Sequence, residues 1–195
     1  MSELTAAEQR ATDNKTIFGF WLYLMTDCVL FASLFAVFAV LHNNTYGGPA
    51  GRELFSLSNV LAETLVLLTS SFTCGLAMLA LHNRKKSQVL FWLLVTFALG
   101  VAFLTLELTE FRHLALEGNG WQRSGFLSSF FTLVGTHGAH ITIGLLWILV
   151  QFAQLMRQGF TAGVTRRFTL FSMFWHFLDV VWIFIFTIVY LMGAA

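Results

Sequence analysis

Five long apolar runs dominate the sequence and decide what kind of protein it can form. They cover about residues 17–41, 60–81, 88–109, 125–156 and 168–192. A helix of about 18 or more apolar residues is long enough to cross the roughly 30 Å hydrocarbon layer of a bilayer. The sequence therefore predicts an all-α polytopic membrane protein. We expect a polar N-terminal segment, 1–16, followed by a single five-helix membrane domain, 17–195.

The overall composition excludes several other classes of protein. Only 11% of the 195 residues are charged and 57% are hydrophobic, whereas soluble domains average about 25% and about 45–50%. The net charge of +1 provides no basic surface for DNA or RNA, so we expect no nucleic-acid partner. Walker, nucleophile-elbow and dinucleotide-binding motifs are absent from the sequence, and no residue pattern indicates a catalytic site.

Lysines and arginines gather in alternate connections between the runs. Segment 1–16 and the connections 82–87 and 157–167 contain eight of them, and the opposite side contains only Arg52, Arg112 and Arg123. Because basic loops favour the cytoplasmic side, this bias predicts a cytoplasmic N-terminus and a periplasmic C-terminus. The densest basic run is also a candidate contact for anionic lipid head groups. It consists of Arg84, Lys85 and Lys86.

Acidic residues and histidines, but no lysine or arginine, lie within the predicted spans. An ionised carboxylate at mid-bilayer costs at least about 2.5–3.5 kcal/mol on insertion scales, so such a group must be partnered, protonated or hydrated. At a rise of about 1.5 Å per residue, these side chains form a central and an outer layer. The central layer contains Asp27, His137, His140, His176 and Asp179. The outer layer contains Glu63, Glu107 and the nearby Glu110.

The spacing of these residues leaves three interpretations open. Residues three apart share a helix face, as do His137 with His140, His176 with Asp179, and Glu107 with Glu110. Hydrogen bonding across helices, which holds a bundle together, is the interpretation we favour. A haem held by two histidines of the fourth and fifth helices is an alternative. A di-iron site requires two Glu-x-x-His motifs and two further glutamates, and the sequence contains one motif, Glu110 to His113.

Asp27 differs from the other acids because no charged residue lies near it on its own helix. Two roles remain open for it: a neutral, hydrogen-bonded structural acid, or a group that handles protons. An independent proton-coupled transporter would use the same acids. Such transporters are often built from repeated halves, and five spans do not divide into equal halves.

Small and aromatic residues indicate how the helices pack. Gly135 and Gly138 on the fourth run permit close helix approach. Aromatic residues near the span ends are expected at the membrane interfaces. These are Trp21, Trp92, Trp121 and Tyr190.

Four segments resemble subunit III of the haem-copper respiratory oxidases. They are GFWLYLMTDCVLFASLF, LELTEFRHL, SGFLSSFFTLVGTHGAHITIGLLW and FWHFLDVVWIFIFTIVYLMG. The resemblance extends from about residue 16 to the C-terminus. Many cytochrome c oxidase members of this family have seven helices, and the five-helix form is similar to subunit III of the bacterial bo-type ubiquinol oxidase.

The resemblance implies a non-catalytic, accessory subunit of a proton-pumping terminal oxidase in the bacterial cytoplasmic membrane. In that family the haems, the copper and the ubiquinol chemistry belong to subunit I, so we expect no cofactor in this chain and subunit I as its partner. The family's intramembrane carboxylate linked to sustained proton uptake corresponds to Asp27, and Glu110 corresponds to the acid at the end of the third helix. His137, His140, His176 and Asp179 correspond to recurrent polar positions. Bound phospholipid is also implied.

Overall fold

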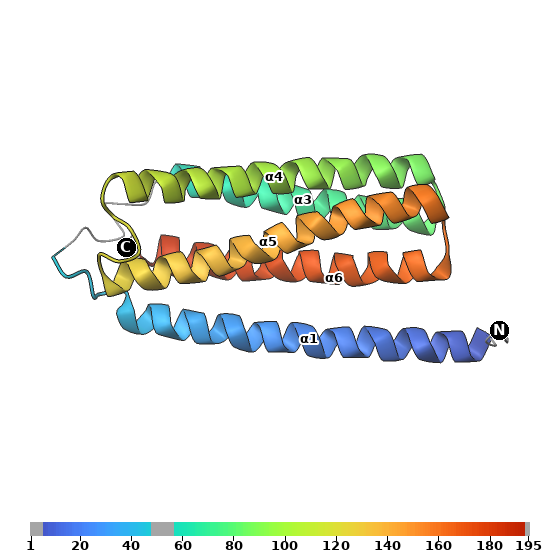
Figure 1. Ribbon diagram of the computed structural model, residues 1–195, viewed down its shortest axis with the longest axis horizontal. Helices are drawn as coiled ribbons and strands as arrows, with labels where there is room; N and C mark the ends of the chain where they lie inside the picture. The colour runs from blue at the N-terminus through green and yellow to red at the C-terminus, as the bar shows by residue number, and fades with distance from the viewer. Residues whose placement is uncertain (1–5, 48–56, 194–195) are drawn as a thin grey trace.

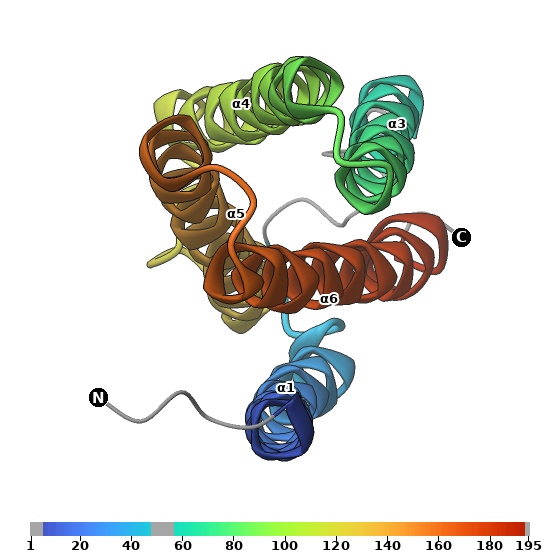
Figure 2. The same cartoon turned by 90° about the vertical axis from the view of Figure 1, so that its right-hand side faces the viewer.

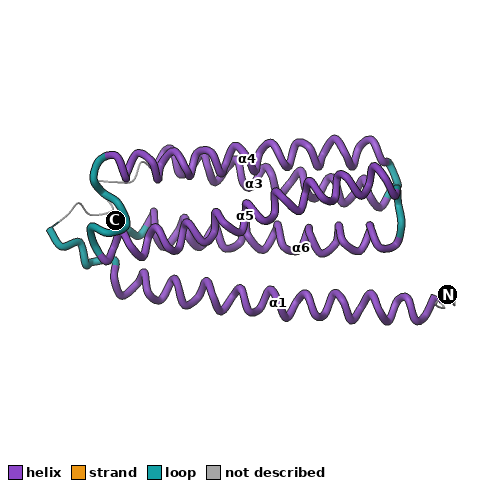
Figure 3. The backbone as a smooth tube through the Cα atoms, viewed as in Figure 1, coloured by secondary structure: helices purple, strands orange, loops and turns teal. Residues whose placement is uncertain are grey.

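The computed structural model describes residues 6–47 and 57–193, which are helical apart from short connections (Figure 1, Figure 3). Helix α1 comprises Ala6–Leu41, α3 Leu57–His82, α4 Lys86–Leu116, α5 Gly125–Gln158 and α6 Ala162–Ile185. A π-helical segment, η1, continues α6 over Phe186–Leu191. Within the described residues, five helical stretches are long and apolar enough to cross a membrane. The predicted all-α, five-span fold is confirmed. Arg52 lies outside the described residues.

Three helices extend beyond the predicted runs by about two turns or more. Helix α1 begins at Ala6 rather than near residue 17, α4 continues to Leu116 rather than ending near residue 109, and α6 begins at Ala162 rather than near residue 168. The reason is that hydropathy marks the part of a helix that can lie in hydrocarbon, whereas helix propensity sets its length. Alanine, glutamate, glutamine and arginine, which fill residues 6–11, are good helix formers in water.

Local capping chemistry defines several helix ends. The hydroxyl of Ser124 accepts a hydrogen bond from the backbone N–H of Leu127 (3.1 Å) and starts α5. Gly159 ends α5 with a φ of 65°, a left-handed conformation that glycine adopts without a steric penalty. Arg84 adopts a φ of 52° in the tight turn between α3 and α4. These features turn the chain back into the bundle at each end.

The helices form an antiparallel bundle in which α6 holds a central position. Figure 2 shows α6 between α1 and α3, with α4 and α5 on the other side of the bundle. Helix α6 contacts α1, α3 and α5, whereas α1 lies at the edge of the bundle and packs mainly against α5 and α6. The start of α1 and the turns after α3 and α5 lie at the same end (Figure 1). The three segments rich in lysine and arginine therefore lie at one end of the bundle. That this end faces the cytoplasm remains a prediction.

A tryptophan of α6 fills the centre of the bundle where two glycines permit it. A Cβ atom on Gly100 of α4 would lie 3.0 Å from the Trp175 ring, and one on Gly144 of α5 would lie 2.7 Å from it. The indole N–H of Trp175 donates to the hydroxyl of Ser70 on α3 (3.1 Å). This fully buried side chain therefore joins four helices and fixes how α6 is rotated toward the polar residues described below.

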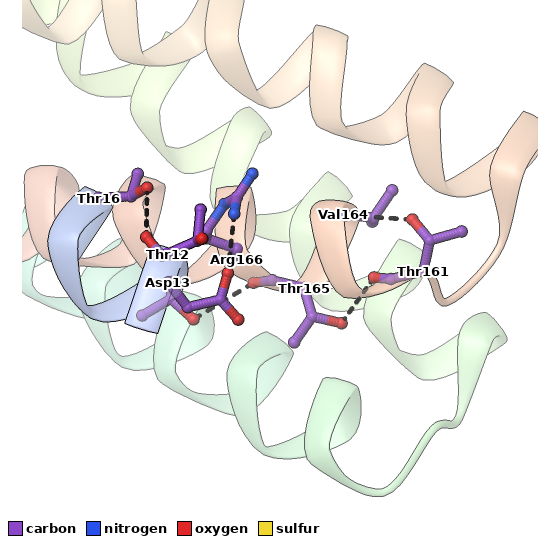
Figure 4. A network of polar contacts seen from close by, with 8 residues as sticks. Thr12, Asp13, Thr16, Thr161, Val164, Thr165 and Arg166 are labelled. Carbon is purple, nitrogen blue, oxygen red and sulfur yellow. Dashed lines mark hydrogen bonds and ion pairs between the residues drawn. The ribbon is translucent and has the colours of Figure 1, made fainter. Parts of the chain in front are cut away.

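The end of the bundle where α1 begins is joined by an ion pair (Figure 4). Arg166, near the start of α6, donates from Nη1 to Oδ1 of Asp13 on α1 (2.7 Å). Beside it, the Thr161 hydroxyl caps α6 by accepting from the backbone N–H of Val164 (3.2 Å). Both partners of the ion pair are about one-third exposed, so it contributes on the order of 0.2–1 kcal/mol.

Candidate functional site

Asp27 of α1 and His140 of α5 meet where these two helices pack, away from either end of α1. Oδ1 of Asp27 lies 3.8 Å from Nε2 of His140, and the two side chains are only 11% and 14% exposed. The other ring nitrogen, Nδ1, lies 2.8 Å from the carbonyl oxygen of Thr136. Since a carbonyl can only accept, Nδ1 carries a hydrogen, and a neutral His140 ring turns its lone pair toward Asp27. The Tyr23 hydroxyl also lies beside the carboxyl group.

This geometry gives the Asp27 carboxyl group and His140 one place to share a proton. The proton resides either on the carboxyl group, leaving two neutral groups, or on Nε2, leaving an ion pair. In both states the net charge of the pair is zero, which a low-dielectric interior requires. A movement of about 1 Å would bring the two atoms to direct hydrogen-bond distance. The geometry therefore allows a proton to pass between Oδ1 of Asp27 and Nε2 of His140 with little rearrangement.

His137 lies one turn from His140 but occupies a different environment. Aromatic rings surround it, with the Trp182 ring centroid 5.2 Å and the Phe103 centroid 5.9 Å from its own. Neither ring nitrogen has a hydrogen-bond partner among the described residues, and both are shielded from solvent. Phe31 packs on both histidines, so they do share one face of α5. The enclosed nitrogens leave no room for a haem iron at His137.

The second predicted pair, His176 and Asp179 of α6, meets at Ser71 of α3. Oγ of Ser71 lies 2.5 Å from Nδ1 of His176, and the same hydroxyl lies beside the Asp179 carboxyl group. Asp179 is buried, whereas His176 is exposed on the surface of the bundle. Helical spacing gives no indication of Ser71, because it comes from a different helix.

The three glutamates of the outer layer form a cluster between α3 and α4. Glu63, Glu107 and Glu110 lie close enough to interact electrostatically. The Glu107 carboxyl group lies directly against Gly138 of α5. Oε2 of Glu110 accepts a hydrogen bond from the hydroxyl of Tyr190 (3.1 Å). A cleft of about 240 Å³ adjoins the cluster and is lined by Asn59, Glu63, Leu106, Thr109, Glu110, His113 and Leu114.

Tyr190 corrects one expectation from the sequence. Its position near a span end predicts an interfacial aromatic, but the residue is fully buried in η1 and binds Glu110. Glu110 of α4 accepts a hydrogen bond from the Tyr190 hydroxyl inside the protein. The hydroxyl is therefore satisfied without contact with water or head groups at the membrane interface. The pattern of glutamates and a tyrosine at the same depth was the available signal for this contact.

The described residues contain no group of three or more histidine, cysteine, aspartate or glutamate side chains arranged to hold a metal ion. His113, the histidine of the Glu-x-x-His motif, is exposed and lies 3.5 Å from Glu117 rather than facing a second motif. The geometry thus provides pairs of polar groups for proton exchange and for helix association.

The basic run at the α3–α4 turn divides into two environments. Arg84 and Lys85 are exposed, whereas Lys86 is half-buried and donates to the Met156 carbonyl oxygen of α5 (3.2 Å). The Lys86 ammonium has three donor hydrogens, so this bond leaves two of them for another partner. The charged groups of Arg84 and Lys85 lie at the surface.

Comparison with known proteins assigns the family. A family model described as "Cytochrome c oxidase subunit III" matches residues 2–194. The chain belongs to the cytochrome c oxidase subunit III family. This subunit III is 60% identical over 181 residues to a Pseudomonas aeruginosa protein named cytochrome bo(3) ubiquinol oxidase subunit 3, covering 93% of this chain and 87% of the relative.

Two further relatives of this subunit III carry different names. A Bacillus subtilis protein named quinol oxidase subunit 3 is 46% identical over 95% of this chain and 91% of its own length. A protein of Bacillus sp. strain PS3 named cytochrome c oxidase subunit 3 is 45% identical over 96% and 92%. Together with the five apolar helices, these bacterial relatives identify this subunit III as a multi-pass protein of a bacterial inner membrane.

Proposed function

We propose that this chain is the non-catalytic subunit III of a proton-pumping terminal oxidase that oxidises ubiquinol and reduces oxygen to water. The observation that carries the proposal is the 60% identity, over nearly the whole chain, to a protein named as a ubiquinol oxidase subunit 3. The relative named as a cytochrome c oxidase subunit is 45% identical. The difference favours ubiquinol as the electron donor of the complex.

In this proposal, the haems, the copper and the ubiquinol site lie in the catalytic subunit I. This chain contributes a rigid membrane bundle and polar groups at defined depths. The Asp27–His140 pair supports proton uptake by the catalytic subunit, because it holds one exchangeable proton at the middle of the membrane. The polar contacts that join α6 to α3 support the bundle itself.

Phospholipids are the second class of proposed partner. An apolar groove of about 250 Å³ runs between α1 and α6 and suits an acyl chain. It is lined by Cys28, Phe31, Ala32, Phe35, Phe177, Val180, Val181 and Phe184. At the end of the bundle where α1 begins, Arg84, Lys85 and Lys86 are candidate contacts for an anionic head group.

Purification of the tagged chain from its native membranes in mild detergent tests the proposal. We expect it to co-purify with a larger subunit that shows haem absorption and contains copper, and we expect the complex to consume oxygen with ubiquinol. Reduced cytochrome c serves as the comparison donor. A colourless bundle without partners would overturn the proposal, and oxygen uptake with cytochrome c alone would overturn the choice of donor.

A further inference from the structure

His176 lies at the middle of its membrane span and faces outward. The span of α6 and η1 runs from Ala162 to Leu191, and His176 lies at its midpoint. Among the acids and imidazoles at this depth of the described spans, Asp27, His137, His140 and Asp179 are buried or nearly so, and His176 is the exposed one. An imidazole exposed to hydrocarbon would leave a polar nitrogen without a hydrogen bond, which is costly.

The contacts of His176 account for only one of its two ring nitrogens. Nδ1 is held by Ser71, and Nε2 forms no hydrogen bond to a described residue. When Nδ1 donates to the Ser71 hydroxyl, Nε2 is left as an acceptor. When the Ser71 hydroxyl donates to Nδ1 instead, Nε2 carries the ring hydrogen and is a donor.

Exposed hydroxyl groups elsewhere on the bundle already form a hydrogen bond to a backbone carbonyl group. Thr69 donates to the Leu65 carbonyl oxygen on its own helix, and Thr187 of η1, which continues α6, donates to that of Ile183. Such side chains can face lipid because their hydrogen is already bonded. Nε2 of His176 cannot be satisfied in this way, since the ring is fixed through its other nitrogen.

The surface around His176 suits a helix. Val180, Ile183 and Phe184 continue the same face of α6, and each is about half exposed. Figure 2 shows that this face belongs to a helix flanked by α1 and α3. A ridge of side chains on a neighbouring helix can pack against such a face.

We propose that this face of α6 seats a transmembrane helix of the oxidase's catalytic subunit, which presents a hydroxyl or amide side chain to Nε2 of His176. A hydroxyl or amide fits because it can both donate and accept, and so can pair with Nε2 in either tautomer of His176. The inference rests on the proposed function, because it takes the neighbouring helix from the catalytic subunit of that complex.

Photo-cross-linking in the assembled complex tests which face is covered. A benzophenone amino acid replaces Val180, which is 50% exposed and one turn from His176, or Leu94, which is 57% exposed on α4. We expect the Val180 probe to form an adduct with the haem-bearing subunit and the Leu94 probe to form none. Lipid adducts alone at Val180, or a subunit adduct from Leu94 alone, would overturn the inference.

A set of variants tests the hydrogen bond itself. His176→Leu removes the outward nitrogen, whereas Thr187→Val removes an exposed hydroxyl that is already bonded to its own helix. Interhelical hydrogen bonds in membranes average about 0.6 kcal/mol, which corresponds to about a threefold change in an equilibrium. We expect His176→Leu to lower retention of this subunit on the complex about threefold during a detergent wash, His176→Gln to restore it, and Thr187→Val to leave it unchanged.

The outcomes separate this inference from the proposed function. If the chain co-purifies with the haem-bearing subunit but His176→Leu and Thr187→Val are retained equally, the inference is wrong and the proposed function stands. If no haem-bearing subunit co-purifies with the unmodified chain, the proposed function is wrong and the inference falls with it. The amount of each variant in the membrane verifies that it inserts normally.

Discussion

The carboxyl group of Glu107 lies against the backbone of Gly138, so that a Cβ atom at position 138 would lie 2.5 Å from Oε1 of Glu107. Both residues are on buried helix faces, Glu107 on α4 and Gly138 on α5. The absence of a side chain on α5 therefore makes room for an acid of the outer layer. This relationship links the small residues of the sequence to the position of the glutamate cluster.

Replacement of this glycine tests that relationship directly. We expect Gly138→Ala to destabilise the bundle by about 1–3 kcal/mol, because the added methyl group overpacks the contact with Glu107. Gly135→Ala is the matched control, since its Cβ atom would lie at an ordinary 3.7 Å from Phe111. Thermal unfolding of the purified complex measures both. Glu107→Ala should partly rescue Gly138→Ala, and additive effects of the two changes would contradict a direct contact.

The two buried indole groups of α6 should each contribute a small, separable coupling energy to the α3–α6 contact. Trp175 donates to Ser70 (3.1 Å) and Trp182 donates to Thr64 (3.0 Å). Double-mutant cycles in membrane helices average about 0.6 kcal/mol per hydrogen bond, with a maximum near 1.7 kcal/mol. We expect Trp175→Phe with Ser70→Ala to give a coupling energy in this range. The cross pair, Trp175→Phe with Thr64→Val, should give none.

The two histidines of α5 should respond differently to the same substitution. His137 is packed among aromatic rings and has no described hydrogen bond, so His137→Phe conserves its shape and should cost less than about 1.5 kcal/mol. His140→Phe removes the partner of Asp27. We expect only the second variant to lose oxidase activity progressively during sustained turnover. Equal losses in both variants would show that the pair with Asp27 is not the reason.

Helical spacing could predict which polar residues share a helix face. In the structure, His137 and His140 both pack against the ring of Phe31. His176 and Asp179 both lie beside the hydroxyl of Ser71. It could not predict partners on other helices. Those depend on how each helix is rotated and tilted, which packing against neighbouring helices decides.

Two particular contacts show this limit. The Asp27–His140 contact joins helices far apart in the sequence, and its distance depends on how α1 packs against α5. Tyr190 could not be distinguished from an interfacial aromatic until the position of Glu110 was known. Hydropathy likewise located the spans but not the helix ends, because α1 and α4 continue into segments that are polar.

Asp27→Asn separates a structural role of this residue from a role with protons. The amide is similar in size to the carboxyl group and can donate a hydrogen bond to Nε2 of His140, so the variant should assemble normally with the complex. It cannot exchange a proton with the imidazole. We therefore expect an unchanged initial rate of oxygen uptake, followed by a several-fold faster loss of activity during continuous turnover. Asp27→Glu, which retains an exchangeable proton, is the control and should keep most of the durability. An oxygen electrode records the initial rate of oxygen uptake and its decline during turnover. If the Asp27→Asn variant keeps its activity for as long as the unmodified complex, Asp27 has a purely structural role.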